Sequence, residues 1–180
     1  GQHFRLFITE ESGTTTDKVI AMATELTIHG SAQTENSTTK DTTDVSRRDG
    51  EQIDLPHSWN ATDGMDGGSD FFRGSCLYAK TLNKADLPVA DQYYIEFRGT
   101  NSSADVYVNG NKLAHHDGGY STWRCDITDA IKAGQKTLIA VSVDNGINDT
   151  VYPQVADFTF YGGLYRGVNL ICVDESHFDL

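Results

Sequence analysis

The sequence predicts an all-β fold, a β-sandwich of the jelly-roll type, in one domain spanning residues 1–180. Short segments with alternating apolar and polar residues recur along the chain, at a spacing typical of about seven or eight strands. Turns rich in Gly, Asn and Asp separate these segments. A helical signal is confined to a turn or two. The length suits one well-cored domain and is too short for two of ordinary size.

The stretch 92–119 is the centre of this interpretation. It holds two strand patterns whose apolar residues alternate along the chain: Tyr93, Ile95, Phe97, Val106 and Val108. Asn109-Gly110 is the pair best able to take positive φ at both centres of a tight turn. Residues 113–116 are therefore expected to return as the partner strand of a hairpin.

The other predicted strands are, in chain order, 3–9, 75–82, 120–127, 137–144 and 168–173. Between the third and fourth of these, residues 126–134 carry an Asp or Thr cap and a turn of helix that Gly134 stops. Segment 18–28 is compatible with short strands or a helical turn. Residues from about 29 to 51 are crowded with Ser, Thr, Asn and Asp, which predicts a long polar excursion.

The formal net charge is −12 and the pI is near 4.7. This balance argues against nucleic acid and anionic lipid as partners, because affinity for phosphate comes mostly from Lys and Arg. The chain also has no apolar run approaching the roughly 18 residues that a membrane helix needs. Cys76, Cys125 and Cys172 lie in strand-like contexts and are expected to be buried thiols. A Cys76–Cys125 or Cys125–Cys172 bridge remains an open alternative.

Several sequence pieces occur in the order found in one enzyme family: 54–59, 72–74, 103–110, 116–120, 126–129, 143–145 and 157–166. From about residue 52 to 173 the chain resembles the N-terminal sugar-binding domain of glycoside hydrolase family two. That family contains β-galactosidases, β-glucuronidases and β-mannosidases, and the resemblance is greatest to the β-galactosidase-like members. It implies a galactose-binding-domain-like jelly roll and a β-galactoside or related sugar as ligand. Ser58 and Ser75-Cys76 depart from the family, which usually has Asp and an aromatic residue there.

Glycosidic cleavage requires two carboxyl groups on either side of the bond. The resemblance implies that both belong to a (β/α)₈ barrel that follows the sandwich, and such a barrel takes about 250 residues. Among the glutamates, Glu10, Glu11, Glu35 and Glu51 lie in polar loops, and Glu96 lies on an outward strand face. The chain is therefore expected to be a fragment of a glycoside hydrolase that is inactive alone, with the barrel of the same polypeptide as its partner.

Asp157 is the residue expected to approach the chemistry. Aromatic residues surround it in sequence, namely Tyr152, Phe158, Phe160, Tyr161 and Tyr165. A carboxylate accepts hydrogen bonds from neighbouring sugar hydroxyls, and aromatic faces pack against the C–H side of a pyranose. The resemblance implies that Asp157 reaches the active site on the barrel and, in some members, a bound cation; the chain itself is expected to hold no cofactor. The predicted substrate-binding residues are Asp157, Phe158, Tyr161 and Arg73. The alternative is an Asp157 that caps its loop or pairs with Arg166.

Other polar residues receive more ordinary interpretations. His115-His116-Asp117 lacks evident further ligands for a metal and is expected at a strand end. His57 is expected to pack beside Trp59. Arg73 and Arg166 together have the chemistry to clamp an acidic sugar such as glucuronate, although a structural ion pair is the expected role of Arg166.

Two further functional hypotheses stay open at this point. One is a free-standing carbohydrate-binding module or adhesin, which should present an exposed aromatic platform and bind a simple galactoside. The other is a purely structural interaction domain, in which the loop around Asp157 would be packed inward.

Overall fold

The computed structural model describes residues 4–8, 51–63, 72–152, 156 and 158–178; for 4–8 and residue 51 it describes the backbone alone. The strands are β1 Phe4–Ile8, β2 Glu51–Ile53, β3 Ser75–Asn83, β4 Gln92–Phe97, β5 Ser103–Val108, β6 Asn111–Asp117, β7 Trp123–Asp126, β8 Lys136–Asp144 and β9 Val168–Val173. The short helices within these residues are η2 Lys84–Asp86, a 3₁₀ turn, and α2 Thr128–Ala133. Neither is long and apolar enough to cross a membrane. Segment 18–28 and nearly all of the predicted polar excursion at about 29–51 lie outside the described residues.

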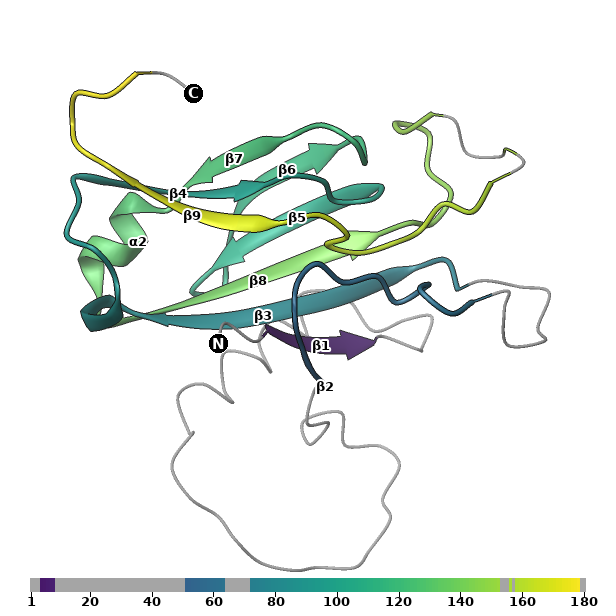
Figure 1. Cartoon of the computed structure of the whole chain (residues 1–180), viewed down its shortest axis with the longest axis horizontal. Helices are drawn as coiled ribbons and strands as arrows, with labels where there is room; N and C mark the ends of the chain where they lie inside the picture. Colours follow the sequence, from purple (N-terminus) through teal and green to yellow (C-terminus); the bar gives the residue numbers. More distant parts are fainter. Residues whose placement is uncertain (1–3, 9–50, 64–71, 153–155, 157, 179–180) are drawn as a thin grey trace, which may run out of the picture.

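The strands form two antiparallel sheets, with the orders β2-β1-β3-β8-β5-β6 and β7-β4-β9. Figure 1 shows them as two layers, with α2 at one end of the sandwich. The all-β sandwich predicted from the alternating pattern is confirmed. Helix α2 also lies where the sequence predicts a helical turn, and the Asp126 carboxylate accepts a hydrogen bond from the Thr128 N–H.

The core lies between the two sheets. In β4, Tyr93, Ile95 and Phe97 are buried while the residues between them are partly exposed, which confirms the predicted alternation. Val106 of β5 and Val143 of β8 face the same core and are fully buried. Burial of such side chains stabilises the fold by about 1.5–3 kcal/mol each.

The hairpin of β5 and β6 is built as the Asn109-Gly110 pair predicts. Both residues have positive φ, 51° and 84°, and the paired residues Val108 and Asn111 flank them directly. The Asn109 side chain also accepts a hydrogen bond of 2.9 Å from the backbone N–H of Leu138 in β8. The predicted return strand at 113–116 is confirmed, but it begins earlier because the turn has only two residues.

Strand β7 is shorter than the predicted strand at 120–127. The first residues of the predicted strand form a turn instead, in which the Tyr120 carbonyl accepts a hydrogen bond of 2.9 Å from the Arg166 guanidinium. A sequence pattern cannot anticipate this contact, because the two residues are far apart in the chain.

All the cysteines are free thiols, so neither open disulfide pairing forms. Burial raises the pKa of Cys76 to about 12 and that of Cys125 to about 11. The thiolate is the reactive form of cysteine, so both side chains are chemically inert core residues.

His115 bridges two carboxylates on the hairpin. Its Nδ1 lies 2.5 Å from Asp105 Oδ1 and its Nε2 lies 3.2 Å from Asp117 Oδ1, while Lys112 Nζ lies 2.8 Å from Asp105 Oδ2. The hydrogen bond to Asp105, supported by Asp117 against the opposing effect of burial, raises the pKa of His115 above 6.5. His115 and Asp117, expected at a strand end, lie in the last three residues of β6 and form an ion cluster with Asp105 and Lys112. His116, between them, instead stacks on Trp123, with 4.8 Å between the ring centroids.

We predict that Phe97→Ala lowers the free energy of unfolding by about 3–5 kcal/mol, because it leaves a cavity in the centre of the core. Urea denaturation followed by fluorescence measures this. Phe178→Ala is the matched control: its ring is exposed, so the change should stay within about 0.5 kcal/mol. Equal losses in the two variants would contradict the assigned core.

We also predict that His115 makes the protein less stable as the pH rises. A raised pKa in the folded state means that the stabilisation is complete below pH 6.5 and is lost as the pH rises through the folded pKa. His115 is exposed, so the effect should be a few tenths of a kcal/mol, about that of a surface ion pair. The measurement is the difference in free energy of unfolding between wild type and His115→Gln from pH 5.5 to 9, with His177→Gln as control. A difference that does not change with pH would refute the role of the cluster.

Candidate functional site

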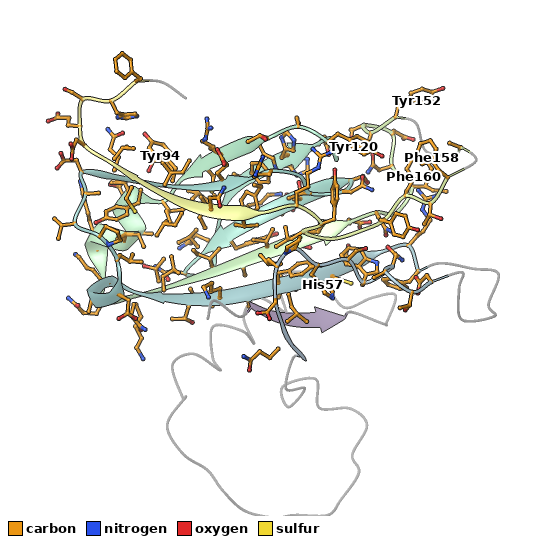
Figure 2. All side chains as sticks on the ribbon, in the orientation of Figure 1. His57, Tyr94, Tyr120, Tyr152, Phe158 and Phe160 are labelled. Carbon is orange, nitrogen blue, oxygen red and sulfur yellow. The ribbon has the colours of Figure 1, made fainter. Side chains whose placement is uncertain are left out.

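Aromatic side chains gather at one end of the sandwich, on the loop between β8 and β9 and on the turn before β7. Figure 2 shows Tyr120, Tyr152, Phe158 and Phe160 together there. Tyr152 is 92% exposed, whereas Phe160 is buried and lies 5.0 Å from Phe158 between ring centroids. Tyr161, 45% exposed, follows on the same loop. We call these five residues the aromatic end.

The loop that carries the aromatic end is fixed from beneath by Asn145, the first residue after β8. Its side chain is completely buried. The amide nitrogen donates to the Phe160 carbonyl at 2.9 Å and to Asn60 Oδ1 at 3.1 Å, and Oδ1 accepts from the Gly74 N–H at 2.9 Å. One side chain therefore ties together three segments that have no sheet of their own.

Asn60 is the second buried anchor. Its Oδ1 also accepts a hydrogen bond of 2.7 Å from the Gly162 N–H, and its Nδ2 donates to Asp63 Oδ2 at 2.7 Å and to the Phe72 carbonyl at 2.8 Å. The Trp59 ring packs on Gly162 so closely that any Cβ at that position would overlap it. Glycine is thus required there to let the loop reach the indole.

Asn101 is the third anchor, on the loop before β5. It is 4% exposed, and its Nδ2 donates a hydrogen bond of 2.7 Å to the Tyr161 carbonyl. Its backbone forms a bridge with Gly163, whose φ of 118° suits a residue without a Cβ. Together the three asparagines hold the backbone of 160–163, which sets the positions of Phe160 and Tyr161.

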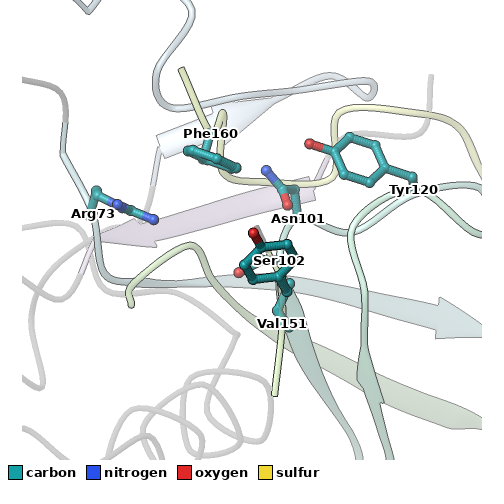
Figure 3. A pocket seen from close by; sticks show the side chains of 7 residues that line it. Arg73, Asn101, Ser102, Tyr120, Val151 and Phe160 are labelled. Atoms are coloured by element: carbon teal, nitrogen blue, oxygen red, sulfur yellow. The ribbon is translucent and has the colours of Figure 1, made fainter. Parts of the chain in front are cut away.

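A small pocket opens within the aromatic end. Figure 3 shows the residues that line it, which are Arg73, Asn101, Ser102, Tyr120, Val151, Tyr152 and Phe160. The Arg73 guanidinium lies 5.4 Å from the Phe160 ring centroid, and its Nε donates to the Asn145 carbonyl at 3.0 Å. The cavity volume is about 10 Å³, room for about one water molecule. This pocket alone cannot enclose a sugar, so the aromatic end presents an open wall.

The predicted site residues have different outcomes. Phe158 and Tyr161 are exposed at the aromatic end, and Arg73 lines its pocket. Asp157 lies outside the described residues, so its role stays a prediction.

Arg166 lies apart from the pocket, with its guanidinium 5.2 Å from the Tyr165 ring centroid. His57, expected to pack beside Trp59, contacts Tyr78, with its Nδ1 3.0 Å from the Tyr78 hydroxyl.

Sequence reasoning missed the three buried asparagines. Asn145 belonged to a quoted family piece, 143–145, but nothing in its neighbours marked it as a hub. Asn60 and Asn101 lie outside the predicted strands, where the sequence analysis expected only turns rich in Gly, Asn and Asp. An asparagine amide buried in a loop region is a signal only once the fold brings it to other backbone groups.

We predict that Asn145→Ala lowers the free energy of unfolding by about 2–3 kcal/mol or more, because it leaves buried backbone groups without partners. Amide exchange at Gly74 and Gly162 should accelerate, since both belong to the network. Asn111→Ala, an exposed asparagine on β6, is the control and should change both readouts little. Unchanged exchange at Gly162 in Asn145→Ala would show that the loop holds its shape without this anchor.

Comparisons with known proteins agree on one family. The family model for "Glycosyl hydrolases family 2, sugar binding domain" matches residues 68–173. A β-glucuronidase of Bacteroides fragilis is 40% identical over 128 residues, which are 71% of this chain and 18% of that protein. A β-galactosidase of Thermoanaerobacter pseudethanolicus is 32% identical over 130 residues, again 71% of this chain and 18% of that protein.

Solved structures give the same result. The FMN-binding β-glucuronidase from Facaelibacterium prausnitzii is 43% identical, with a TM-score of 0.67 over 74% of this chain and 21% of that one. The β-glucuronidase of Parabacteroides merdae is 27% identical, with a TM-score of 0.71 over 96% of this chain and 21% of that one. The chain spans about a fifth of the length of these relatives. Its family match, identity and two-sheet fold together show that the chain belongs to glycosyl hydrolase family 2, as a sugar-binding domain.

Proposed function

We propose that the aromatic end forms one wall of the substrate site of a family 2 β-glycosidase, completed by a (β/α)₈ barrel of the same polypeptide. The observation that supports this most is the set of exposed rings, Tyr120, Tyr152, Phe158 and Tyr161, beside a loop backbone at 160–163 that buried asparagines hold. Rigid aromatic faces suit the C–H faces of a pyranose, and fixed positions keep the entropy cost of binding low.

The openness of the wall favours a shared site. Ligand sites of sugar or drug size usually enclose about 300–1,000 Å³ and bury most of the ligand. The pocket beside Arg73 offers about 10 Å³. A second surface must therefore supply the remaining contacts, and the barrel that the family resemblance implies would supply both them and the two catalytic carboxyl groups. The domain alone is proposed to be without hydrolytic activity.

The proposed substrate is a β-glucuronide, with a β-galactoside as the second candidate. The relatives of 40% and 38% identity are named as a β-glucuronidase and a putative β-glucuronidase, whereas β-galactosidases stand at 32% and 29%. Arg73 is a suitable partner for a uronate carboxylate because a guanidinium offers paired donors. The β-galactosidase-like specificity expected from the sequence is thus supported only as far as the family.

We predict that Asp157→Asn, in the full-length polypeptide, lowers kcat/KM by about 100-fold or more, since hydrogen bonds from sugar hydroxyls to a carboxylate are lost. The melting temperature should change by no more than about 2 °C, because the carboxylate is proposed to bind the substrate and not to stabilise the fold. Hydrolysis of 4-nitrophenyl β-D-glucuronide and β-D-galactoside measures activity and also ranks the two substrates. Asp149→Asn, an exposed aspartate on the same loop, is the matched control. Near-normal kinetics in Asp157→Asn would remove this role.

The exposed rings also favour a second function, that of an independent carbohydrate-binding module. Calorimetry on the chain alone separates the two. A shared wall should bind methyl β-D-glucuronide and methyl β-D-galactoside weakly or not at all. Micromolar binding of either sugar, lost in Tyr152→Ala, would establish the module instead.

A further inference from the structure

A second feature lies next to Tyr120, which lines the pocket and whose carbonyl accepts a hydrogen bond from Arg166. Arg98, Thr122, Arg166 and Gly167 line an open cleft of about 370 Å³ between the end of β4, the turn before β7 and the start of β9. We call it the arginine cleft. Its volume falls within the range of about 300–1,000 Å³ that small-molecule sites occupy.

Arg166 is held in place before any ligand arrives. Its Nη1 donates to the Tyr120 carbonyl at 2.9 Å, and its guanidinium lies over the Tyr165 ring. The Tyr165 hydroxyl in turn donates to the Gly119 carbonyl at 2.5 Å. Gly99 leaves the space for this arrangement, because a Cβ there would lie 3.0 Å from both Arg166 Cδ and the Tyr165 hydroxyl. The bonds described use only one nitrogen of the guanidinium, so donors remain for a ligand.

Backbone groups of Arg98 make hydrogen bonds to the segment that carries Arg166. Its N–H donates to the Gly167 carbonyl at 3.0 Å, and its own carbonyl lies 3.5 Å from Arg166 Nη1. Its side chain is exposed and makes no hydrogen bond within the part of the chain that the structure describes. The nearby Glu96 carboxylate accepts hydrogen bonds from Arg124 at 2.6 Å and from Asn169 at 3.0 Å, and the positive charge of Arg98 also acts on it.

This arrangement contrasts with that of two cations elsewhere in the sandwich. Lys112 is paired with Asp105 and Arg124 with Glu96, as expected in a chain with a net charge of −12. Two guanidinium groups that line one cleft repel each other, and an anion between them removes that repulsion. Arginine suits this role because its planar donors match the oxygens of a carboxylate or sulfate.

We propose that the arginine cleft is an oxyanion-binding site, which takes the carboxylate or sulfate group of a small ligand. The Thr122 hydroxyl lines the same cleft and can add a neutral hydrogen bond. An inorganic ion and an acidic saccharide share this chemistry, and the cleft has room for either. The proposal does not depend on the proposed function, because the site lies within this chain and needs no barrel.

The test is titration of the chain with sodium sulfate, sodium D-glucuronate and neutral D-glucose, at constant ionic strength set with NaCl. Amide shifts of Gly99 and Gly167 in NMR spectra report on the cleft. We expect saturable shifts with sulfate or glucuronate and none with glucose. Arg98→Ala should weaken binding by about tenfold or more, as for a lost charge-assisted hydrogen bond.

Lys136→Ala is the matched control, since it removes one positive charge from an exposed residue at the start of β8, near α2 and far from the cleft. It should leave binding unchanged. The proposal is overturned if no anion saturates, if Arg98→Ala binds like wild type, or if Lys136→Ala weakens binding equally, since that result means general screening. Tighter binding of glucuronate than of sulfate would assign the cleft to an acidic saccharide; equal binding would assign it to the oxyanion alone.

Discussion

The aromatic end depends on hydrogen bonds made by one buried amide, the side chain of Asn145. The loops around it belong to no sheet, yet their backbone groups are buried and must find partners. An asparagine side chain offers two donors and an acceptor with two lone pairs on a short stem. Asn145 donates to the Phe160 carbonyl and to Asn60 Oδ1, and it accepts from the Gly74 N–H. Removing this amide would leave several buried polar groups without hydrogen-bond partners. The interaction therefore fixes a loop conformation that apolar packing alone would leave undefined.

The position of this amide follows from the most buried strand. Strand β8 lies between β3 and β5 and has buried residues on both faces, including Val141, Val143 and Ala140. Asp144, at its end, accepts a 2.6 Å hydrogen bond from the Ser75 hydroxyl of β3. The next residue is Asn145. The central sheet thus sets the position of Asn145, and the hydrogen bond from its side chain sets the position of the loop backbone at Phe160.

The sequence was sufficient for features that depend on near neighbours. Alternation in β4 and the Asn109-Gly110 turn follow from local backbone chemistry, and both are present. It was insufficient where distant segments meet. The strand order, with β8 between β3 and β5, cannot be read from one sequence. Alternation indicates which face of a strand is buried, but not which strands pair with it. The role of Asn60 depends on the same long-range pairing. The proposed role of Asp157 comes from family resemblance and remains a prediction.

The aromatic end and the arginine cleft place different demands on a ligand. The aromatic end is an open wall that offers contact on one face only, so affinity there requires a second surface. The arginine cleft has a concave shape and fixed charge of its own. The net charge of −12 repels an anion at long range, but at physiological salt this repulsion fades over a Debye length of about 8 Å. Within contact distance the guanidinium groups dominate, because charge-assisted hydrogen bonds are roughly twice as strong as neutral ones. An acidic ligand would therefore be selected by the local pair of arginines in spite of the acidic surface around them.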